Sequence, residues 1–240
     1  MNWNNYLLEQ KSPIGYYAHL GVFEGAVRGI FDLSTIPADT KILDMSTPLK
    51  KFKLTYTNLS SLNANKNIQA IRLGEIDDDR VSVFSTLPNL KYLHISVNKQ
   101  NEIPDLTPLK NLQVLVLSSI KKVENINFLK GLTNLKTLYI HEINNMSDLE
   151  PLSSLTNLEE LFLDHGKMSG TGQSVKSMVP ISKLTNLKYL AFILNVEKKN
   201  YDITPLLLLK KLQKLRIMQR YLDNGNREKL LNELPLITEL

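Results

Sequence analysis

Leucine and other apolar residues recur at every third position through much of the chain, most clearly between Leu129 and Leu163. Within this stretch the step of three shortens to two at Leu138-Ile140 and again at Leu161-Leu163. A sustained step of three matches neither an α-helix, with about 3.6 residues per turn, nor a β-strand, with a repeat of about two. The pattern therefore predicts a coil that directs one apolar side chain inward per turn, with a short strand wherever the step becomes two.

The short strands recur at regular intervals along the chain. Equivalent residues are Leu43, Ile71, Leu93, Leu115, Leu138, Leu161, Leu190 and Leu215. The first interval is 28 residues, and the following ones are 22, 22, 23, 23, 29 and 25. Periods of about 20–29 residues with this apolar pattern are typical of leucine-rich repeats. We therefore predict an α/β fold: a curved leucine-rich-repeat solenoid with a parallel β-sheet on its concave face and irregular, 3-10 or short helical segments on its convex side.

The repeats define the expected domain organisation, a single domain over residues 1–240. The aromatic, non-repeating residues 1–32 are expected to form an N-terminal cap, residues 33–218 the repeats, and residues 219–240 a C-terminal cap. Terminal repeats of solenoids are atypical because they cover the open ends of the core.

Two further segments carry local predictions. An Asn-Gly turn precedes Asn226, which we expect to cap a short helix carrying Leu230, Leu231 and Leu234. Residues 166–178 contain three glycines and three serines and account for the 29-residue interval. They predict a flexible surface loop, which is either a tolerated insertion or a flap beside the binding face.

Composition excludes several classes of protein. The chain has no cysteine, which excludes disulfides, thiol nucleophiles and thiolate metal sites and favours a reducing compartment. No run of 18 apolar residues predicts a membrane span, and the N-terminus lacks a signal-peptide pattern, so we expect a cytoplasmic protein without membrane contact. The net charge is +5, but the lysines lie in separated pairs, which makes nucleic acid the less favoured partner.

One phrase, Leu-x-Asn-Leu, recurs in five repeats, with asparagine at Asn89, Asn111, Asn134, Asn157 and Asn186. Together with Pro-Leu steps at Pro108, Pro151 and Pro205, it resembles the bacterial internalin-type leucine-rich repeats, which are similar to those of a eukaryotic phosphatase-regulating subunit. The resemblance covers roughly residues 62–218. It implies the solenoid fold and a binding function, but no particular partner. The cap and anchor segments of internalins are missing from this sequence, so we do not expect an adhesin or invasin.

The sequence also departs from the family at the position after each strand. The family's asparagine occurs there only at Asn98 and Asn195, and the equivalent residues are Ile120, Ile143, Gly166 and Arg220. We therefore expect an irregular coil on that side.

The strand register predicts which side chains reach the concave face, because they alternate with the inward leucines. The three expected columns are Ala70, Tyr92, Val114, Thr137, Glu160, Tyr189 and Lys214; Arg72, His94, Val116, Tyr139, Phe162, Ala191 and Arg216; and Gly74, Ser96, Ser118, His141, Asp164, Ile193 and Met218. The candidate partner-binding residues are Tyr92, His94, Tyr139, His141, Glu160, Phe162, Asp164 and Tyr189.

Exposed aromatic side chains beside charges are typical anchors of protein interfaces, so these residues predict a binding patch. Alternatively, the aromatic side chains only pack against each other as cross-strand pairs. By the same register Leu138 points inward and Tyr139 outward. We therefore expect Leu138→Ala to unfold the protein, and Tyr139→Ala to leave it folded but weaken a partner.

Two arrangements on the same face resemble chemical sites but are not favoured. Ser118, His141 and Asp164 share one column, but a hydrolytic triad also needs an oxyanion hole and a shielded pocket, which no motif here predicts. His141-Glu142 and Asp164-His165 lie on adjacent strands, but neighbouring residues of a strand point to opposite faces and cannot all reach one metal ion. We therefore predict no catalytic residues, no metal and no cofactor.

The favoured function is a non-enzymatic module that binds an unidentified partner protein and is monomeric when free. An inhibitor or immunity-type protein is the more specific form of this hypothesis. Binding of nucleic acid or another anionic surface through scattered basic residues is the alternative. Trp3 and the Tyr16-Tyr17 pair offer a different patch for the protein partner.

Overall fold

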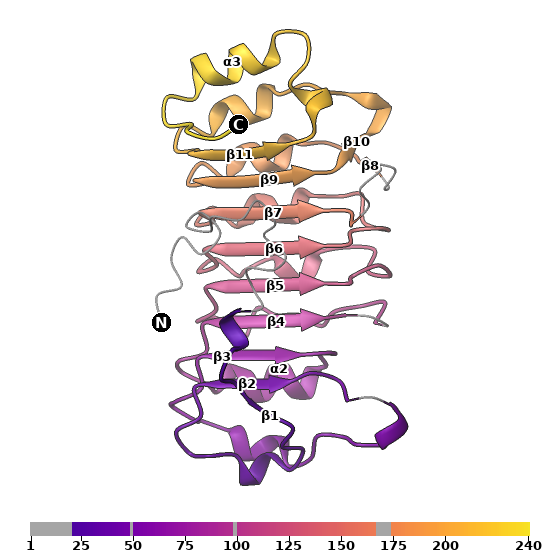
Figure 1. Cartoon of the computed structure of the whole chain (residues 1–240), viewed down its shortest axis with the longest axis vertical. Coiled ribbons are helices and arrows are strands. Elements are labelled where there is room, and N and C mark those ends of the chain that lie inside the picture. Colours follow the sequence, from indigo (N-terminus) through magenta and orange to yellow (C-terminus); the bar gives the residue numbers. More distant parts are fainter. Residues whose placement is uncertain (1–20, 49, 98–99, 167–173) are drawn as a thin grey trace.

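A computed structural model describes residues 21–48, 50–97, 100–166 and 174–240. Its main feature is a nine-stranded parallel sheet whose strands stack along the long axis of the molecule (Figure 1). In spatial order these are β1 (Val27–Arg28), β2 (Ile42–Met45), β3 (Ala70–Leu73), β4 (Tyr92–Ser96), β5 (Val114–Ser118), β6 (Thr137–His141), β7 (Glu160–Asp164), β9 (Tyr189–Ile193) and β11 (Lys214–Ile217). Trp3, Tyr16, Tyr17, Asn98 and residues 167–173 lie outside the described residues.

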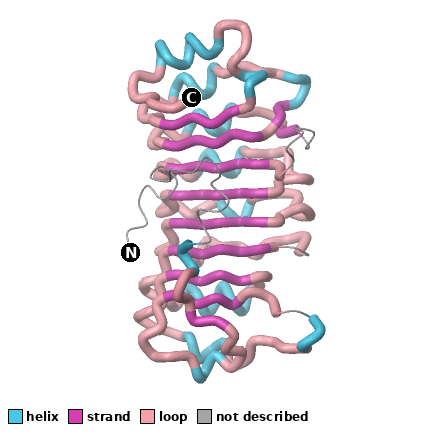
Figure 2. Tube along the Cα trace, in the orientation of Figure 1, coloured by secondary structure: helices cyan, strands magenta, loops and turns pink. Residues whose placement is uncertain are grey.

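Short helical segments connect the strands (Figure 2). The α-helices are α2 (Asp78–Ser85) and α3 (Asn226–Glu233). The 3-10 helices are η1 (Gly21–Phe23), η2 (Leu33–Thr35), η3 (Lys50–Phe52), η4 (Leu59–Leu62), η5 (Asn127–Leu129), η6 (Glu150–Ser154), η7 (Val179–Lys183), η8 (Glu197–Lys199), η9 (Thr204–Leu208) and η10 (Gln219–Tyr221). No helix in the described part of the chain combines the length and apolarity needed to cross a bilayer.

The register of the sheet confirms the predicted strands. Leu43 pairs with Ile71, Ile71 with Leu93, and the same position continues through Leu115, Leu138, Leu161, Leu190 and Leu215. These residues belong to one continuous buried core. The leucine-rich-repeat solenoid expected from the sequence is therefore the observed fold.

The step of three has a direct cause in backbone hydrogen bonding. Leu152 N donates to Leu149 O, Leu155 N to Leu152 O, and Leu158 N to Leu155 O, each at 2.9 Å. Such bonds between residues three apart define 3-10 geometry, with about three residues per turn, so every third side chain points the same way. The leucines joined in this way are all buried.

The recurrent asparagine links successive repeats. The Nδ2 atoms of Asn89, Asn134 and Asn157 donate to backbone oxygens of the preceding repeat, at Lys66 (2.7 Å), Lys110 (2.8 Å) and Thr133 (2.8 Å). In the last repeat Lys211 stands at this position, and its Nζ atom donates to Asn186 Oδ1 at 2.7 Å. The phrase that carried the family resemblance therefore has a structural role.

The prediction of a surface loop over residues 166–178 is wrong for Ser174–Val175 and for Met178. Ser174–Val175 form strand β8, which pairs in parallel with β10 (Asn195–Val196) in a second, two-stranded sheet. Val175 and Met178 enter the main core. They do so because the step of three that leads to Leu190 already begins at Val175.

The residues that follow the strands, where the family has asparagine, differ in their surroundings. Ile120 and Ile143 are buried in the core. Asn195 lies in β10, where its Oδ1 atom accepts a hydrogen bond from Arg220 Nη1 at 2.8 Å.

At the C-terminal end the expected helix forms, but its predicted cap is wrong. Asn224 and Gly225 both have positive φ, 57° and 82°, as an Asn-Gly turn favours. Gly225 is the N-cap of α3, while Asn226 Nδ2 donates to Tyr221 O at 3.1 Å. Leu230 and Leu234 are buried, whereas Leu231 is exposed. At the other end, β1 falls within the segment expected to be a cap and pairs with β2.

Candidate binding surface

The strand register places the predicted columns on one face of the sheet. Tyr92 pairs with Val114, Thr137 with Glu160, and Glu160 with Tyr189; in the middle column His94 pairs with Val116 and Tyr139 with Phe162. The register was therefore predicted correctly, and the question is which of these side chains a partner can reach.

The expectation that the aromatic centre is exposed is wrong. Tyr92, His94, Tyr139, Glu160 and Phe162 expose between 0 and 5% of their surface. They lie in or against a second apolar cluster, here called the concave cluster, which consists of Val22, Phe23, Ala70, Tyr92, Val114, Val116, Tyr139, Phe162 and Ala191.

Two kinds of contact contribute to this burial. The rings of Tyr139 and Phe162 stack with centroids 4.2 Å apart, which is the cross-strand packing considered as the alternative. In addition, η1 lies across the sheet near β4 (Figure 1). Its Phe23 ring meets Tyr92 edge-on at 5.6 Å and lies 6.2 Å from His94.

His94 is held in this apolar setting by hydroxyl groups. Its Nε2 atom lies 3.0 Å from Ser118 Oγ, which in turn lies 2.9 Å from Ser96 Oγ. Burial, reinforced by the charge of Arg72, lowers the pKa of His94 to about 3. The imidazole is therefore neutral at physiological pH.

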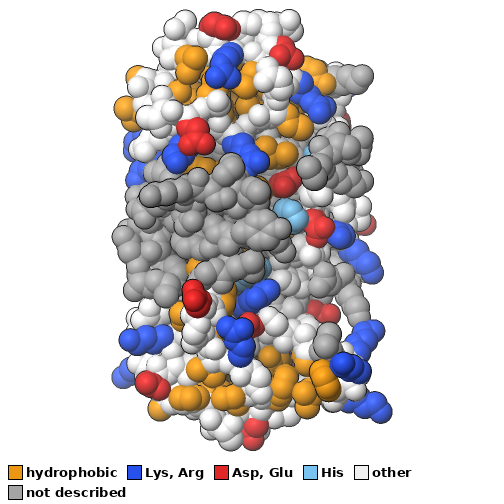
Figure 3. All heavy atoms as spheres, in the orientation of Figure 1, with side chains coloured by type: hydrophobic (Ala, Val, Ile, Leu, Met, Phe, Trp, Pro, Cys, Tyr) orange, Lys and Arg blue, Asp and Glu red, His pale blue; other side chains and the backbone are white. Residues whose placement is uncertain are grey.

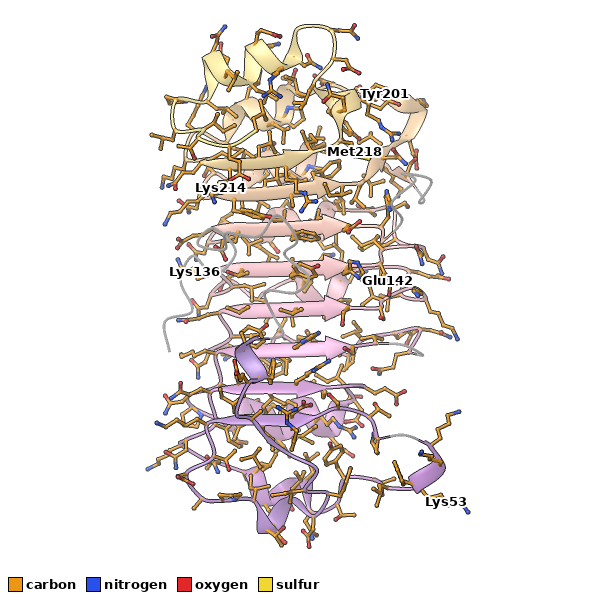
Figure 4. All side chains as sticks on the ribbon, in the orientation of Figure 1. Lys53, Lys136, Glu142, Tyr201, Lys214 and Met218 are labelled. Carbon is orange, nitrogen blue, oxygen red and sulfur yellow. The ribbon has the colours of Figure 1, made fainter. Side chains whose placement is uncertain are left out.

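The column of Ser118, His141 and Asp164 does not form a triad. His141 Nε2 lies 3.8 Å from Asp164 Oδ2, but Ser118 contacts His94 and Ser96 instead. Glu142, at the end of β6 (Figure 4), pairs with Lys121 at 2.9 Å. Within the described ranges, no three His, Asp or Glu side chains are grouped so that they could hold a metal ion.

The accessible part of the concave face lies at the strand ends and toward the C-terminal strands. His141 and Asp164 expose 20% and 21% of their side chains. Tyr189, Ile193, Lys214 and Met218 are half-buried, and Arg216 is exposed. Figure 3 shows hydrophobic and basic side chains interspersed over this end of the molecule. We call Tyr189, Ile193, Arg216 and Met218 the C-terminal concave patch.

The patch combines apolar surface with fixed polar groups. Burial raises the pKa of Tyr189 to about 12, although nearby Arg216 opposes the shift, so its hydroxyl stays protonated and can donate. Lys214 Nζ pairs with Glu239 at 3.3 Å beside the patch. Ile193 and Arg216 lie in the predicted columns, and Met218 follows the end of β11. No pattern in the sequence favours these residues over the aromatic centre.

Comparison with known proteins supports the fold. No family model and no curated protein matches the sequence. A leucine-rich-repeat protein of Leptospira interrogans superimposes with a TM-score of 0.59 at 20% identity, over 89% of this chain and 52% of that one. Internalin C2 of Listeria monocytogenes gives a TM-score of 0.50 at 22% identity, over 77% of this chain and 75% of the other.

A second Listeria internalin, inlF, gives a TM-score of 0.49 at 23% identity, over 77% of this chain and 50% of its own. The chain thus spans about half the length of this internalin and of the Leptospira protein. In fold it is an internalin-like leucine-rich-repeat protein.

Proposed function

We propose that this internalin-like chain is a non-enzymatic module that binds a partner protein through the C-terminal concave patch. The observation that carries the proposal is the partial exposure of Tyr189 and Ile193 on β9, and of Met218 just after β11, together with the exposed Arg216 on the adjacent β11. Tyrosine and arginine are enriched among the residues that dominate binding energy in protein interfaces. A continuous parallel sheet holds these side chains in place, which lowers the entropy cost of binding.

The candidate residues predicted from the sequence take different parts in this proposal. His141, Asp164 and Tyr189 are accessible and extend the patch toward β6. Tyr92, His94, Tyr139, Glu160 and Phe162 are buried and support the sheet from the concave side. Phe23 packs on Tyr92, so a partner could reach that ring only if Phe23 moved away.

A non-enzymatic role is consistent with the geometry of the polar groups. Ser118 is buried and lies against His94, whose lowered pKa makes it a poor base at neutral pH. His141 and Asp164 form an accessible histidine–carboxylate pair, but the hydroxyls of their column, Ser96 and Ser118, bond to each other, and Ser118 also contacts His94. An inhibitor or immunity-type protein is the specific form of binding that we propose.

The test is capture of the partner from a lysate of the source organism with matched variants. Arg216→Glu/Met218→Ser reverses one charge and removes one apolar side chain in the patch. Val179→Ser/Lys183→Glu makes the same changes at exposed positions of η7, on the other side of the molecule. Both should keep the wild-type thermal melt.

The expected result is one stoichiometric protein retained by wild type and by the η7 variant but lost from the patch variant. Loss from both variants, or retention by both, would contradict the assignment of the patch. Retention by the patch variant together with loss on Phe23→Ala would place the partner on the concave cluster instead.

A further inference from the structure

The segment between β2 and β3 projects a turn whose side chains pack against little else. Leu43 and Ile71 are 28 residues apart, whereas Ile71 and Leu93 are 22 apart, so this repeat is six residues longer than the next. The added length contains Lys50-Lys51-Phe52-Lys53-Leu54, here called the basic turn. All five residues are exposed, and the turn juts sideways beyond the ends of the strands (Figures 1 and 4).

The basic turn has a defined shape and a fixed base. Lys53 N donates to Lys50 O at 3.1 Å, and Lys53 adopts a positive φ of 49°, which closes the turn. Two residues after the turn, Tyr56 donates its hydroxyl to Ser46 O at 3.1 Å, and its ring is tilted against that of Phe31 with the centroids 5.0 Å apart. The turn is therefore presented in one orientation.

Its side chains combine apolar surface with uncompensated positive charge. Phe52 and Leu54 expose 56% and 43% of their surface. Lys50, Lys51 and Lys53 make no ion pair with any acidic residue that the structure describes, and Lys51 Nζ lies 5.0 Å from the centroid of the Phe52 ring. The nearby acidic residues belong to the base of the turn and to α2: Glu75 lines a hollow with Leu54 and Tyr56, and Asp77 caps α2 and pairs with Arg80.

We propose that the basic turn is a contact site for an anionic lipid bilayer surface, with Phe52 and Leu54 entering the headgroup region and the three lysines meeting anionic headgroups. Apolar side chains flanked by lysine are the combination that binds at membrane interfaces, where long basic side chains keep their charge in the headgroup layer. The inference is independent of the concave patch, because it uses residues on a different flank of the molecule. It departs from the expectation of no membrane contact, which rested on the absence of an apolar run long enough to span a bilayer and does not bear on contact with its surface.

Two other partners fit the turn less well. A protein interface of ordinary size buries about 800 Å² per partner and seats its anchors in pockets, which five residues on a projecting turn do not provide. Single-stranded nucleic acid stacks its bases on a series of aromatic side chains, and the turn has one. A bilayer needs neither a complementary shape nor a stacking platform.

The experiment is cosedimentation of the full chain with vesicles of phosphatidylcholine alone or mixed with phosphatidylserine. Wild type is expected to pellet with the mixed vesicles at low salt and to be released as salt rises. Lys51→Gln/Lys53→Gln should weaken binding about fivefold for each lysine removed. Phe52→Ser/Leu54→Ser should abolish the binding that persists at higher salt.

Matched variants distinguish binding by the basic turn from binding that depends only on the overall charge or hydrophobicity of the protein. Lys121→Gln/Lys122→Gln removes the same charge elsewhere, and Val179→Ser removes an apolar side chain with 55% exposure from η7; both should bind like wild type. In addition, the emission of a Phe52→Trp variant should shift to the blue on addition of mixed vesicles, beyond any change in wild type.

Three results would overturn the proposal. The first is that wild type fails to pellet with mixed vesicles at low salt, and the second is that the Lys121→Gln/Lys122→Gln variant binds the vesicles as weakly as the Lys51→Gln/Lys53→Gln variant. The third is a Phe52→Trp emission that does not shift to the blue. Tighter binding to a single-stranded oligonucleotide with the same sensitivity to the turn variants would assign the turn to nucleic acid instead.

Discussion

His94 makes the stability of the concave face depend on pH. It is buried against Phe23, with Ser118 at 3.0 Å from its ring nitrogen and Arg72 and Asp44 as the charged groups that act on it. Its pKa falls from 6.5 to about 3 in the folded protein, mainly because burial disfavours the charged imidazolium. Below pH 6.5 the unfolded chain therefore binds a proton that the folded chain does not.

The predicted consequence is a loss of stability between pH 7 and pH 5. Because the unfolded state binds more protons in this window, the free energy of unfolding falls with pH, by about 2 kcal/mol over the two units. His94→Gln should remove most of this slope. Urea unfolding at several pH values measures the slope. Identical slopes for wild type and His94→Gln would show that His94 is not the group responsible.

At the scale of the element, β6 is buried on both of its faces. Leu138 belongs to the main core and Tyr139 to the concave cluster, where it stacks on Phe162, and neither is exposed. A strand buried on both faces is typical of parallel sheets, which are usually covered on each side. The simple division into an inward core residue and an outward binding residue therefore does not hold for the central strands.

This burial reverses the outcome expected from the sequence for Tyr139→Ala. We now predict that Tyr139→Ala costs about 3–5 kcal/mol of unfolding free energy and Leu138→Ala about 2–5 kcal/mol, because each leaves a cavity in a packed cluster. Arg216→Ala, at an exposed position of the same sheet face, should stay within about 0.5 kcal/mol of wild type. Chemical denaturation gives all three values. A Tyr139→Ala variant as stable as Arg216→Ala would mean that the concave cluster contributes little.

At the scale of the whole molecule, each repeat contacts mainly the repeats next to it, so local stability should vary along the solenoid. The C-terminal end is closed by α3, which packs Leu230 and Leu234 into the core. Residues 238–239 form backbone hydrogen bonds along β11. Leu215 N donates to Glu239 O at 2.9 Å, and Thr238 N donates to Gln213 O at 2.7 Å. This closure protects the edge of β11.

We predict that Leu230→Ala loosens this end selectively. Backbone amides of β11 and β9 should exchange hydrogen faster, while those of β4 and β5 should keep wild-type protection. The reason is that a local loss of stability affects mainly the neighbouring repeats. Hydrogen exchange with mass spectrometry resolves the segments. Uniform acceleration along all strands would indicate that the solenoid unfolds as one cooperative unit.

The sequence by itself determined the repeat, the strands and their register. A spacing of three between leucines reflects 3-10 turns closed by bonds three residues apart, and a spacing of two marks the strand, so both can be read locally from residues such as Leu152, Leu155 and Leu158. The same regularity predicted which residues share the concave face, and the pairing of Leu138 with Leu161 and of Tyr139 with Phe162 confirms it.

Only the tertiary structure decided which of those residues are accessible. Phe23 lies 69 positions before Tyr92 in the sequence (92 − 23), and no periodicity links it to the ring on which it packs. Exposure depends on what covers a face, and that contact is made between segments that are distant along the chain. For this reason the sequence predicts an open surface at Tyr92, which Phe23 covers, and only the folded molecule shows that Arg216 and the basic turn at residues 50–54 are exposed.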